Sequence, residues 1–246
     1  MRLSGKVALV TGGGSGFGAG ICRAFAREGA RVIVADINHE AAKEVASEID
    51  GTALRVDVAD GASVSQMAGA VFGGFGRLDI LVNNAGITHL PQPLEEVEED
   101  AFDRVLAVNA KSVYLTARAF VPAMKEQRSG AILNIASTAG ISPRPGLNWY
   151  NASKGWMITA TKTMAVELAP SGVRVNALCP VAGETPLLAS FMGGDTPENR
   201  ARFLKTIPLG RFSTHEDMGN AALYLCSNEA SMVTGVAMEV DGGRCI

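Results

Sequence analysis

Thr11-Gly12-Gly13-Gly14-Ser15-Gly16-Phe17-Gly18 joins an apolar run at residues 7–10 to a helix-forming stretch that starts at Ala19. A glycine turn between a strand and a helix lets backbone N–H groups and the positive helix N-terminus approach a pyrophosphate, where a Cβ would clash. The glycines fit either Gly14-x-Gly16-x-x-Ala19 or Gly12-x-x-x-Gly16-x-Gly18. Both spacings predict a dinucleotide-binding loop, and a flexible turn is the alternative.

Outward from this loop, short apolar runs rich in β-formers alternate with stretches of amphipathic helical spacing, such as residues 19–28 and 40–48. Such alternation is typical of βαβ units and of a parallel sheet buried on both faces. With 246 residues, of which 47% are hydrophobic, the chain can bury a large core. We therefore predict an α/β fold, a doubly wound parallel β-sheet of the Rossmann type, in a single domain over residues 1–246. The predicted strands are residues 7–10, 31–35, 53–56, 80–82, 131–135, 174–177 and 237–240.

The composition argues against several classes of protein. The net charge of −3 and the 19% of charged residues include no basic run, so the electrostatic footprint of nucleic-acid binding is missing. The cysteines Cys22, Cys179, Cys226 and Cys245 are far apart, which argues against a disulfide framework and against a metal site. No apolar run approaches membrane-spanning length, and MRLSGKVALVTG leads directly into the glycine loop without a signal peptide. We expect a cytoplasmic protein that binds neither nucleic acid nor a membrane.

Asp36 ends the second predicted strand, at the spacing from the glycine loop where an acidic residue accepts hydrogen bonds from the adenosine ribose hydroxyls. Its charge would also repel the ribose phosphate of NADP. A carboxylate at this place can instead cap the helix that begins near His39. Taken together with the glycine loop, Asp36 predicts NAD as the cofactor in preference to NADP.

Tyr150 and Lys154 are one helical turn apart, which places the phenol and the ammonium on the same face of a helix. A free tyrosine has a pKa of about 10, so ionisation at neutral pH requires a nearby cation, which Lys154 can supply. An ordinary surface contact is the alternative for such a pair. Ser137 follows the fifth predicted strand and adds a hydroxyl at the carboxyl edge of the sheet, where doubly wound folds bind ligands. These residues predict acid/base chemistry.

Over nearly its whole length the chain resembles the compact type of short-chain dehydrogenase/reductase (SDR). The glycine loop resembles the family's Thr-Gly-x-x-x-Gly-x-Gly, Asp57-Val58 the pair that holds the adenine, and Asn83-Asn84-Ala85-Gly86 the family's Asn-Asn-Ala-Gly segment. The cofactor contacts that this resemblance implies, together with Asp36, are Gly12, Ser15, Gly16, Phe17, Gly18, Asp36, Ile37, Asp57, Val58, Asn83, Ala85, Gly86, Tyr150, Lys154, Pro180, Gly183 and Thr185.

The same resemblance implies a catalytic tetrad of Asn109, Ser137, Tyr150 and Lys154. In that family arrangement Tyr150 donates or accepts the proton, and Ser137 polarises the carbonyl. Lys154 binds the nicotinamide ribose and lowers the tyrosine pKa, and Asn109 holds a proton-relay water. The implied activity is hydride transfer between NAD(H) and an alcohol or carbonyl carbon.

One segment departs from the family pattern. After the sixth predicted strand the family reads Pro-Gly followed by an apolar residue and Thr, whereas this chain reads Pro180-Val181-Ala182-Gly183-Glu184-Thr185. Val181 replaces the glycine, and Gly183 takes the apolar position. The resemblance therefore does not define how the backbone of this segment contacts the nicotinamide amide. Thr185 stands where the family has its threonine.

Residues 183–210 are the most irregular stretch, and a long irregular excursion inside a compact domain is usually functional. Arg144 is the single cation expected at the pocket, which weighs against phosphorylated or multiply anionic substrates. We expect a small, mostly apolar secondary alcohol or ketone, open-chain or cyclic, as substrate, with a polyol or sugar as the alternative substrate. Packing of a lid onto the domain is the alternative role of the apolar side chains. The side chains expected on the inner face of this lid are Leu187, Leu188, Phe191 and Met192, with a hinge at Gly193-Gly194 and Pro197.

Two other functions share these motifs. The first is 3-oxoacyl-(acyl-carrier-protein) reductase, although Ala131 and Ser171 stand where such enzymes often carry docking arginines. These enzymes also often use NADPH, with an Arg where this chain has Ser15. The second is a catalytically silent NAD-sensing protein, because a fold does not by itself imply catalysis.

The helical stretches at residues 101–126 and 149–168 carry more apolar side chains than one buried face requires. By family resemblance these stretches form a dimer interface within a homotetramer. A homotetramer is therefore the expected assembly.

Overall fold

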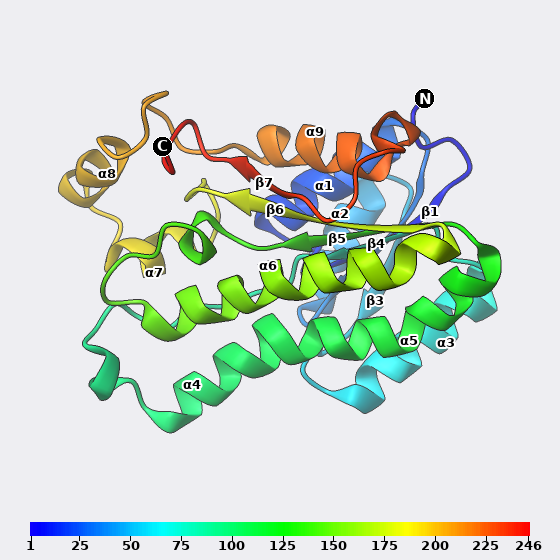
Figure 1. The fold of residues 1–246 in the computed structure, drawn as a ribbon, viewed down its shortest axis with the longest axis horizontal. Coiled ribbons are helices and arrows are strands. Elements are labelled where there is room, and N and C mark those ends of the chain that lie inside the picture. Colours follow the sequence, from blue (N-terminus) through cyan, green and yellow to red (C-terminus); the bar gives the residue numbers. More distant parts are fainter.

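The computed structural model describes residues 1–246 as one α/β domain built on a sheet of seven parallel strands. The strand order β3-β2-β1-β4-β5-β6-β7 runs outward in both directions from the centre, which is the predicted doubly wound sheet (Figure 1). All seven predicted strands are present, and the largest difference is at β6, which continues to Pro180. The strands are β1 (Val7–Thr11), β2 (Arg31–Asp36), β3 (Thr52–Arg55), β4 (Ile80–Asn83), β5 (Gly130–Ile135), β6 (Val173–Pro180) and β7 (Ala237–Val240).

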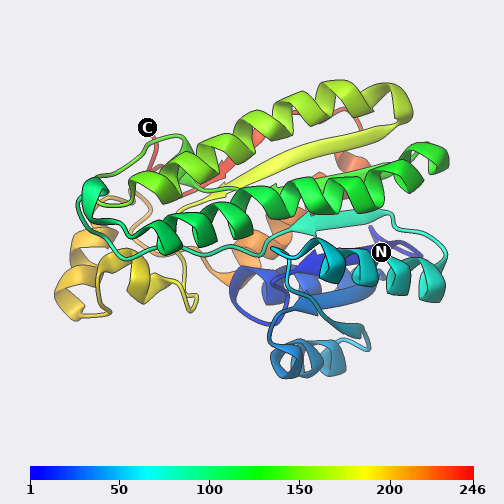
Figure 2. The same cartoon turned by 90° about the horizontal axis from the view of Figure 1, so that it is seen from below.

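Helices cover both faces of the sheet, which is why the central strands are apolar along their whole length. In β1, Ala8 and Val10 enter one buried core, and Val7 and Leu9 enter the other. Figures 1 and 2 show the two helical layers on either side of the sheet. The first core is covered by α1 (Gly16–Arg27), α2 (His39–Glu48) and α9 (His215–Cys226), and the second by α3 (Gly61–Phe75), α5 (Ser112–Gln127) and α6 (Asn148–Leu168).

Helix α1 begins at Gly16 rather than at Ala19, so the second half of the glycine loop is helical. A Cβ on Gly18 would lie 2.1 Å from the carbonyl oxygen of Gly12, so the loop can fold against the helix only without a side chain there. A Cβ on Gly20 would lie 2.5 Å from the carbonyl oxygen of His215 on α9. Gly18 and Gly20 are therefore needed for the close packing of α1 against the glycine loop and against α9.

The helix predicted over residues 101–126 consists of α4 (Glu99–Leu106) and α5, joined by a π-helical turn at Ala107–Lys111. Such π-helical turns are rare and are frequent at functional sites. This turn carries Asn109. None of the helices combines the length and the apolar character that crossing a membrane requires.

The segment predicted as irregular, residues 183–210, contains two short helices, α7 (Leu188–Met192) and α8 (Pro197–Leu204). Figure 1 shows both helices at the end of the molecule where the C-terminus lies. The backbone N–H of Leu209 donates a hydrogen bond to the carbonyl oxygen of Gly242 at 3.1 Å. The C-terminal segment is thereby held against the end of this excursion.

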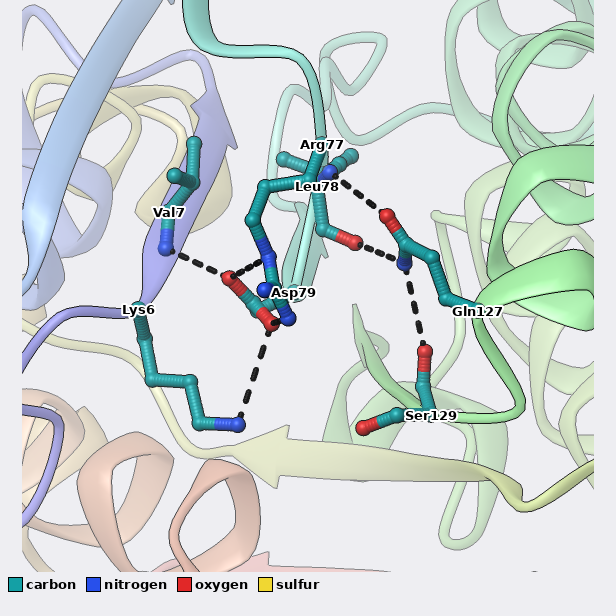
Figure 3. Close-up of polar contacts among 7 residues, drawn as sticks. All are labelled: Lys6, Val7, Arg77, Leu78, Asp79, Gln127 and Ser129. Atoms are coloured by element: carbon teal, nitrogen blue, oxygen red, sulfur yellow. Dashed lines mark hydrogen bonds and ion pairs between the residues drawn. The ribbon is translucent and has the colours of Figure 1, made fainter.

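At the amino edge of the sheet, a buried carboxylate ties β1 to the start of β4. Asp79 accepts hydrogen bonds from the backbone N–H of Val7 at 2.9 Å and from Nε of Arg77 at 3.1 Å, and Lys6 Nζ lies 3.7 Å away (Figure 3). Gln127 at the end of α5 hydrogen-bonds both backbone groups of the residue before Asp79. These contacts hold together the edge of the sheet opposite to the carboxyl ends of its strands.

Candidate active site

A cavity of about 390 Å³ opens at the carboxyl edge of the sheet, where the segments that follow β1 to β6 converge. Doubly wound folds bind their ligands at this edge. Three of the predicted site residues, Gly18, Asn83 and Asn109, do not line the cavity. The predicted residues that do line it are Gly12, Ser15, Gly16, Phe17, Asp36, Ile37, Asp57, Val58, Ala85, Gly86, Ser137, Tyr150, Lys154, Pro180, Gly183 and Thr185.

The rim of the cavity formed by the glycine loop fits a pyrophosphate. Ser15 is the N-cap residue of α1, but its side chain makes no capping hydrogen bond, so the N–H groups of the first turn stay free of a side-chain cap. Gly16 lies in the left-handed region at φ +52°, which a glycine adopts without strain. Phosphate oxygens are the acceptors that such a helix N-terminus binds.

Asp36 lines the cavity beside the glycine loop. Its carboxylate accepts hydrogen bonds from the backbone N–H of Gly14 at 3.0 Å and of Asn38 at 2.9 Å. The cap of α2 is Asn38, whose side chain accepts from Ala41, so the alternative role of Asp36 as a helix cap does not hold. Each carboxylate oxygen has a second lone pair, which is free to accept from a ribose hydroxyl.

The departure from the family pattern after β6 has a physical reason in the glycine loop. A Cβ on Gly183 would lie 2.4 Å from Cζ of Phe17 and 2.6 Å from the carbonyl oxygen of Ser213. The Phe17 ring therefore occupies the space that an apolar side chain at position 183 would need. Val181 lines the cavity and also packs into the apolar cluster beneath α7.

Ser137, Tyr150 and Lys154 all line the cavity, and all three are buried. Lys154 Nζ donates to the carbonyl oxygen of Ile135 at 2.8 Å and lies 5.9 Å from the centroid of the Tyr150 ring. Burial raises the pKa of Tyr150 to about 12, although the Ser137 hydroxyl and then the charge of Arg144 act in the opposite direction. Burial lowers the pKa of Lys154 to about 8.

These pKa values differ from the sequence-based expectation that Lys154 lowers the tyrosine pKa. In this structure the desolvation of the Tyr150 phenol outweighs the nearby charges, so the pKa is raised. The cation that acts on Tyr150 is Arg144. The protonated phenol is therefore the stable form of Tyr150 at neutral pH.

Asn109 lies fully buried behind the cavity. Its side chain accepts a hydrogen bond from Ile87 N at 2.9 Å and donates to Ile87 O at 2.9 Å and to Ser153 Oγ at 3.0 Å. A Cβ on Gly86 would lie 3.4 Å from both Asn109 Oδ1 and Lys154 Nζ. Asn109 therefore holds the loop after β4 against α6, directly beside Lys154.

Asn83 points away from the cavity into a buried polar chain. Its Nδ2 donates to Asn134 Oδ1 at 2.8 Å, and its Oδ1 accepts from Thr116 Oγ1 at 2.9 Å, which links β4 to β5 and α5. The neighbouring residue Asn84 lines the cavity instead and donates to the backbone of the glycine loop. Asn84 is the first residue after β4, and because successive residues of an extended chain point to opposite sides, its side chain faces the cavity while that of Asn83 does not.

The apolar side chains of α7 divide between the cavity and the core beneath the helix. Leu187 and Phe191 line the cavity. Leu188 and Met192 are 2% and 5% exposed and pack with Val181 in a separate apolar cluster. Residues four positions apart share one helix face, so the two pairs must point in different directions. The prediction of a cavity position is therefore wrong for Leu188 and Met192, for which the alternative of lid packing is correct.

Two arginines line the cavity, whereas the sequence indicated one. Arg144 is present as expected, and Arg244 from the C-terminal segment is the second. No local pattern in the sequence marks Arg244, because only the packing of the C-terminal segment against Leu209 brings it to the site. The expectation of a single cation is therefore wrong.

A cavity at the carboxyl edge of a doubly wound sheet, lined by a glycine loop and by a buried tyrosine and lysine, is typical of nicotinamide-dependent oxidoreductases. The family profile described as enoyl-(acyl carrier protein) reductase matches residues 12–244. The chain belongs to the short-chain dehydrogenase/reductase family.

Three relatives illustrate the range of this family. The chain is 50% identical to 4-formylbenzenesulfonate dehydrogenase from Comamonas testosteroni, over 100% of both chains. It is 38% identical to 2,5-dichloro-2,5-cyclohexadiene-1,4-diol dehydrogenase from Sphingobium indicum, over 98% of this chain and 97% of the relative. Among solved structures, 3-ketoacyl-(acyl-carrier-protein) reductase from Brucella melitensis, complexed with NADH, is 49% identical with a TM-score of 0.95, covering 99% of this chain and 100% of that one.

Proposed function

We propose that this protein moves a hydride between NAD(H) and a small, mostly apolar secondary alcohol or ketone. The observation that carries the proposal is the meeting of Ser137, Tyr150 and Lys154 in one cavity with an apolar wall from Leu187 and Phe191. Bound NAD(H) supplies or accepts the hydride. The small cyclic and aromatic compounds for which two of the relatives are named agree with a substrate of this size.

Tyr150 acts as the acid/base of the proposed reaction. Because burial raises its pKa to about 12, the phenol is protonated at neutral pH and can donate its proton to a carbonyl oxygen. By family resemblance, Ser137 polarises the carbonyl, Lys154 binds the nicotinamide ribose and Asn109 holds a relay water. The positive charge of Arg144 stabilises the phenolate that forms when the proton leaves.

The test is reduction of a panel of ketones and aromatic aldehydes, followed at the NADH absorbance band. Tyr150→Phe should lower kcat by about 10²–10⁴-fold, the usual contribution of a general acid, while NADH binding measured by fluorescence persists. Tyr224→Phe is the matched control, because Tyr224 is 36% exposed on α9 and lies outside the cavity. Retention of most of kcat by Tyr150→Phe would contradict the proposal.

The proposed cofactor preference rests on Asp36. NAD(H) should be preferred over NADP(H) by a factor of at least about ten in kcat/KM, since the carboxylate accepts from ribose hydroxyls and repels a phosphate. Asp36→Ala should bring the ratio of kcat/KM for NAD(H) to that for NADP(H) closer to one, mainly by changing KM for the cofactor. Asp60→Ala is the control, because Asp60 caps α3 and does not line the cavity. Equal efficiency of the wild type with both cofactors would refute the assignment.

A second candidate, 3-oxoacyl-(acyl-carrier-protein) reductase, is favoured by the solved structure of that description at 49% identity. A 3-oxoacyl thioester included in the panel separates the two functions. A clear preference for the thioester over small cyclic ketones would support the second candidate. Binding of NADH without turnover of any carbonyl compound would instead favour a catalytically silent NAD-sensing protein.

The proposed assembly is a homotetramer. Large apolar side chains remain exposed on α5 and α6, with Tyr114 at 51%, Trp156 at 44% and Val166 at 77%. Burial of such side chains against another copy is favourable. The family resemblance of these helices to a dimer interface supports the same assembly.

A further inference from the structure

We propose that the substrate of this site carries one anionic group, a carboxylate or a sulfonate, which Arg144 and Arg244 bind beside Phe191 and Phe203. The inference rests on the proposed function, because it names the chemical class of the alcohol or ketone. It adds a charged recognition point to a pocket whose other walls are largely apolar.

Arg144 is held in place by its surroundings, so its charge is available at a fixed position. Its Nη2 donates to the carbonyl oxygen of Phe191 at 2.7 Å, and its guanidinium carbon lies 4.7 Å from the centroid of the Phe203 ring. The backbone carbonyl of Arg144 accepts from Asn151 Nδ2 on α6 at 2.8 Å. No carboxylate pairs with the Arg144 guanidinium, which leaves most of its donors free.

Arg244 brings a second unpaired cation to the same cavity. Its guanidinium makes no ion pair and no hydrogen bond within the chain, although its neighbour Asp241 lies close in sequence. The Asp241 carboxylate is used by the backbone N–H groups of Gly243 and Cys245. Burial, which is the largest effect, lowers the pKa of Arg144; Tyr150 acts in the opposite direction, and the positive charges of Arg244 and Arg202 lower the pKa further.

Two like charges that face one cavity without a counterion repel each other, and a bound anion would remove this repulsion. Guanidinium groups suit carboxylates and sulfonates, because their donors form a planar fork. The pyrophosphate position at the N-terminus of α1 is formed by different residues. The two arginines are therefore available to the substrate.

The proposed anion site lies close to the proposed proton donor. The centroid of the Phe191 ring lies 5.2 Å from the centroid of the Tyr150 ring. The same Phe191 centroid lies 5.9 Å from Cζ of Arg144. The Phe191 ring therefore adjoins both the proposed proton donor and the proposed anion site. Aromatic ketones that carry one anionic substituent on the ring therefore probe both positions with a single molecule.

The test compares para-acetylbenzoate with para-acetylbenzamide, its neutral counterpart of nearly the same shape, and with para-acetylbenzenesulfonate. In the wild type, kcat/KM for an anionic ketone should exceed that for the amide by about 10- to 100-fold, as expected for hydrogen bonds between charged groups. The preferred anion distinguishes a carboxylate site from a sulfonate site. Arg244→Gln should reduce the ratio of anionic to neutral substrate by about tenfold or more.

Arg202→Gln is the matched control, because Arg202 lies near Arg144 on α8 but does not line the cavity. It should leave the ratio of anionic to neutral substrate as in the wild type. Equal kcat/KM for the amide and both anions in the wild type would overturn the proposal. An unchanged ratio in Arg244→Gln would overturn it as well.

A direct binding measurement separates failure of this inference from failure of the proposed function. Titration calorimetry of the NAD-saturated protein should show tighter binding of benzoate or benzenesulfonate than of benzamide, and Arg244→Gln should abolish the difference. If no ketone is reduced, the proposed function fails, and the binding measurement alone decides whether the anion site exists. Equal binding of the three compounds would then refute the anion site.

Discussion

Replacing Lys154 with methionine should stabilise the folded protein at neutral pH, although it removes a proposed site residue. Burial lowers the pKa of Lys154 from 10.5 to about 8. At about 1.4 kcal/mol per pH unit, this difference corresponds to about 3 kcal/mol that the charged ammonium costs the folded state. Methionine has a similar length and no charge, so it removes this cost.

The substitution also removes one favourable contact. Lys154 Nζ donates to the carbonyl oxygen of Ile135 at 2.8 Å, and such a hydrogen bond contributes about 1 kcal/mol. The net effect of Lys154→Met below the folded-state pKa is therefore a gain of about 2 kcal/mol in the free energy of unfolding.

The pH dependence gives the sharper test. Because the pKa of Lys154 is about 8 in the folded state and 10.5 in the unfolded chain, the unfolded chain binds more protons between these values. The wild type should therefore gain stability as the pH rises through this window, and below it the cost is fully present. The methionine variant lacks this gain. The difference in the free energy of unfolding between the two proteins should therefore shrink as the pH rises and then change sign.

The assay is urea unfolding of both proteins without cofactor, followed by tryptophan fluorescence of Trp149 and Trp156 at a matched protein concentration. Other groups that titrate in both proteins cancel in the difference. A difference between wild type and Lys154→Met that stays constant from about pH 7 to about pH 10 would show that burial does not perturb this lysine.

Three further predictions concern the lid, the amino edge and the assembly. Leu187→Ala should change the ranking of ketones in the kinetic panel, whereas Leu188→Ala should leave the ranking intact and lower the free energy of unfolding by about 2–5 kcal/mol; the reverse pattern would contradict the division of α7. Asp79→Ala should cost about 1–3 kcal/mol of stability in thermal or urea unfolding, because Val7 N–H loses its acceptor, with KM unchanged; an altered KM would show that the two edges of the sheet are coupled. Light scattering at micromolar concentration should give the mass of a homotetramer, and a monomeric mass would refute the proposed assembly.

Much of the fold and of the cofactor side of the cavity could be predicted from local patterns. The alternation of apolar strands and amphipathic helices required a parallel sheet covered on both faces, and all seven strands follow it. In such a sheet the strand ends converge at one edge, so residues placed just after strands, such as Gly12, Asp36 and Ser137, had to meet there. The spacing of Tyr150 and Lys154 on one helix face is equally local.

The remaining features depended on contacts between distant segments, which no local pattern encodes. Position 183 requires glycine because the Phe17 ring fills the adjacent space, and Arg244 reaches the cavity only because the C-terminal segment packs against Leu209. The raised pKa of Tyr150 likewise reflects the total burial of the phenol, to which many segments contribute. Periodicity and spacing therefore specified which edge of the sheet holds the site, while packing decided which side chains face the cavity and how strongly they are desolvated.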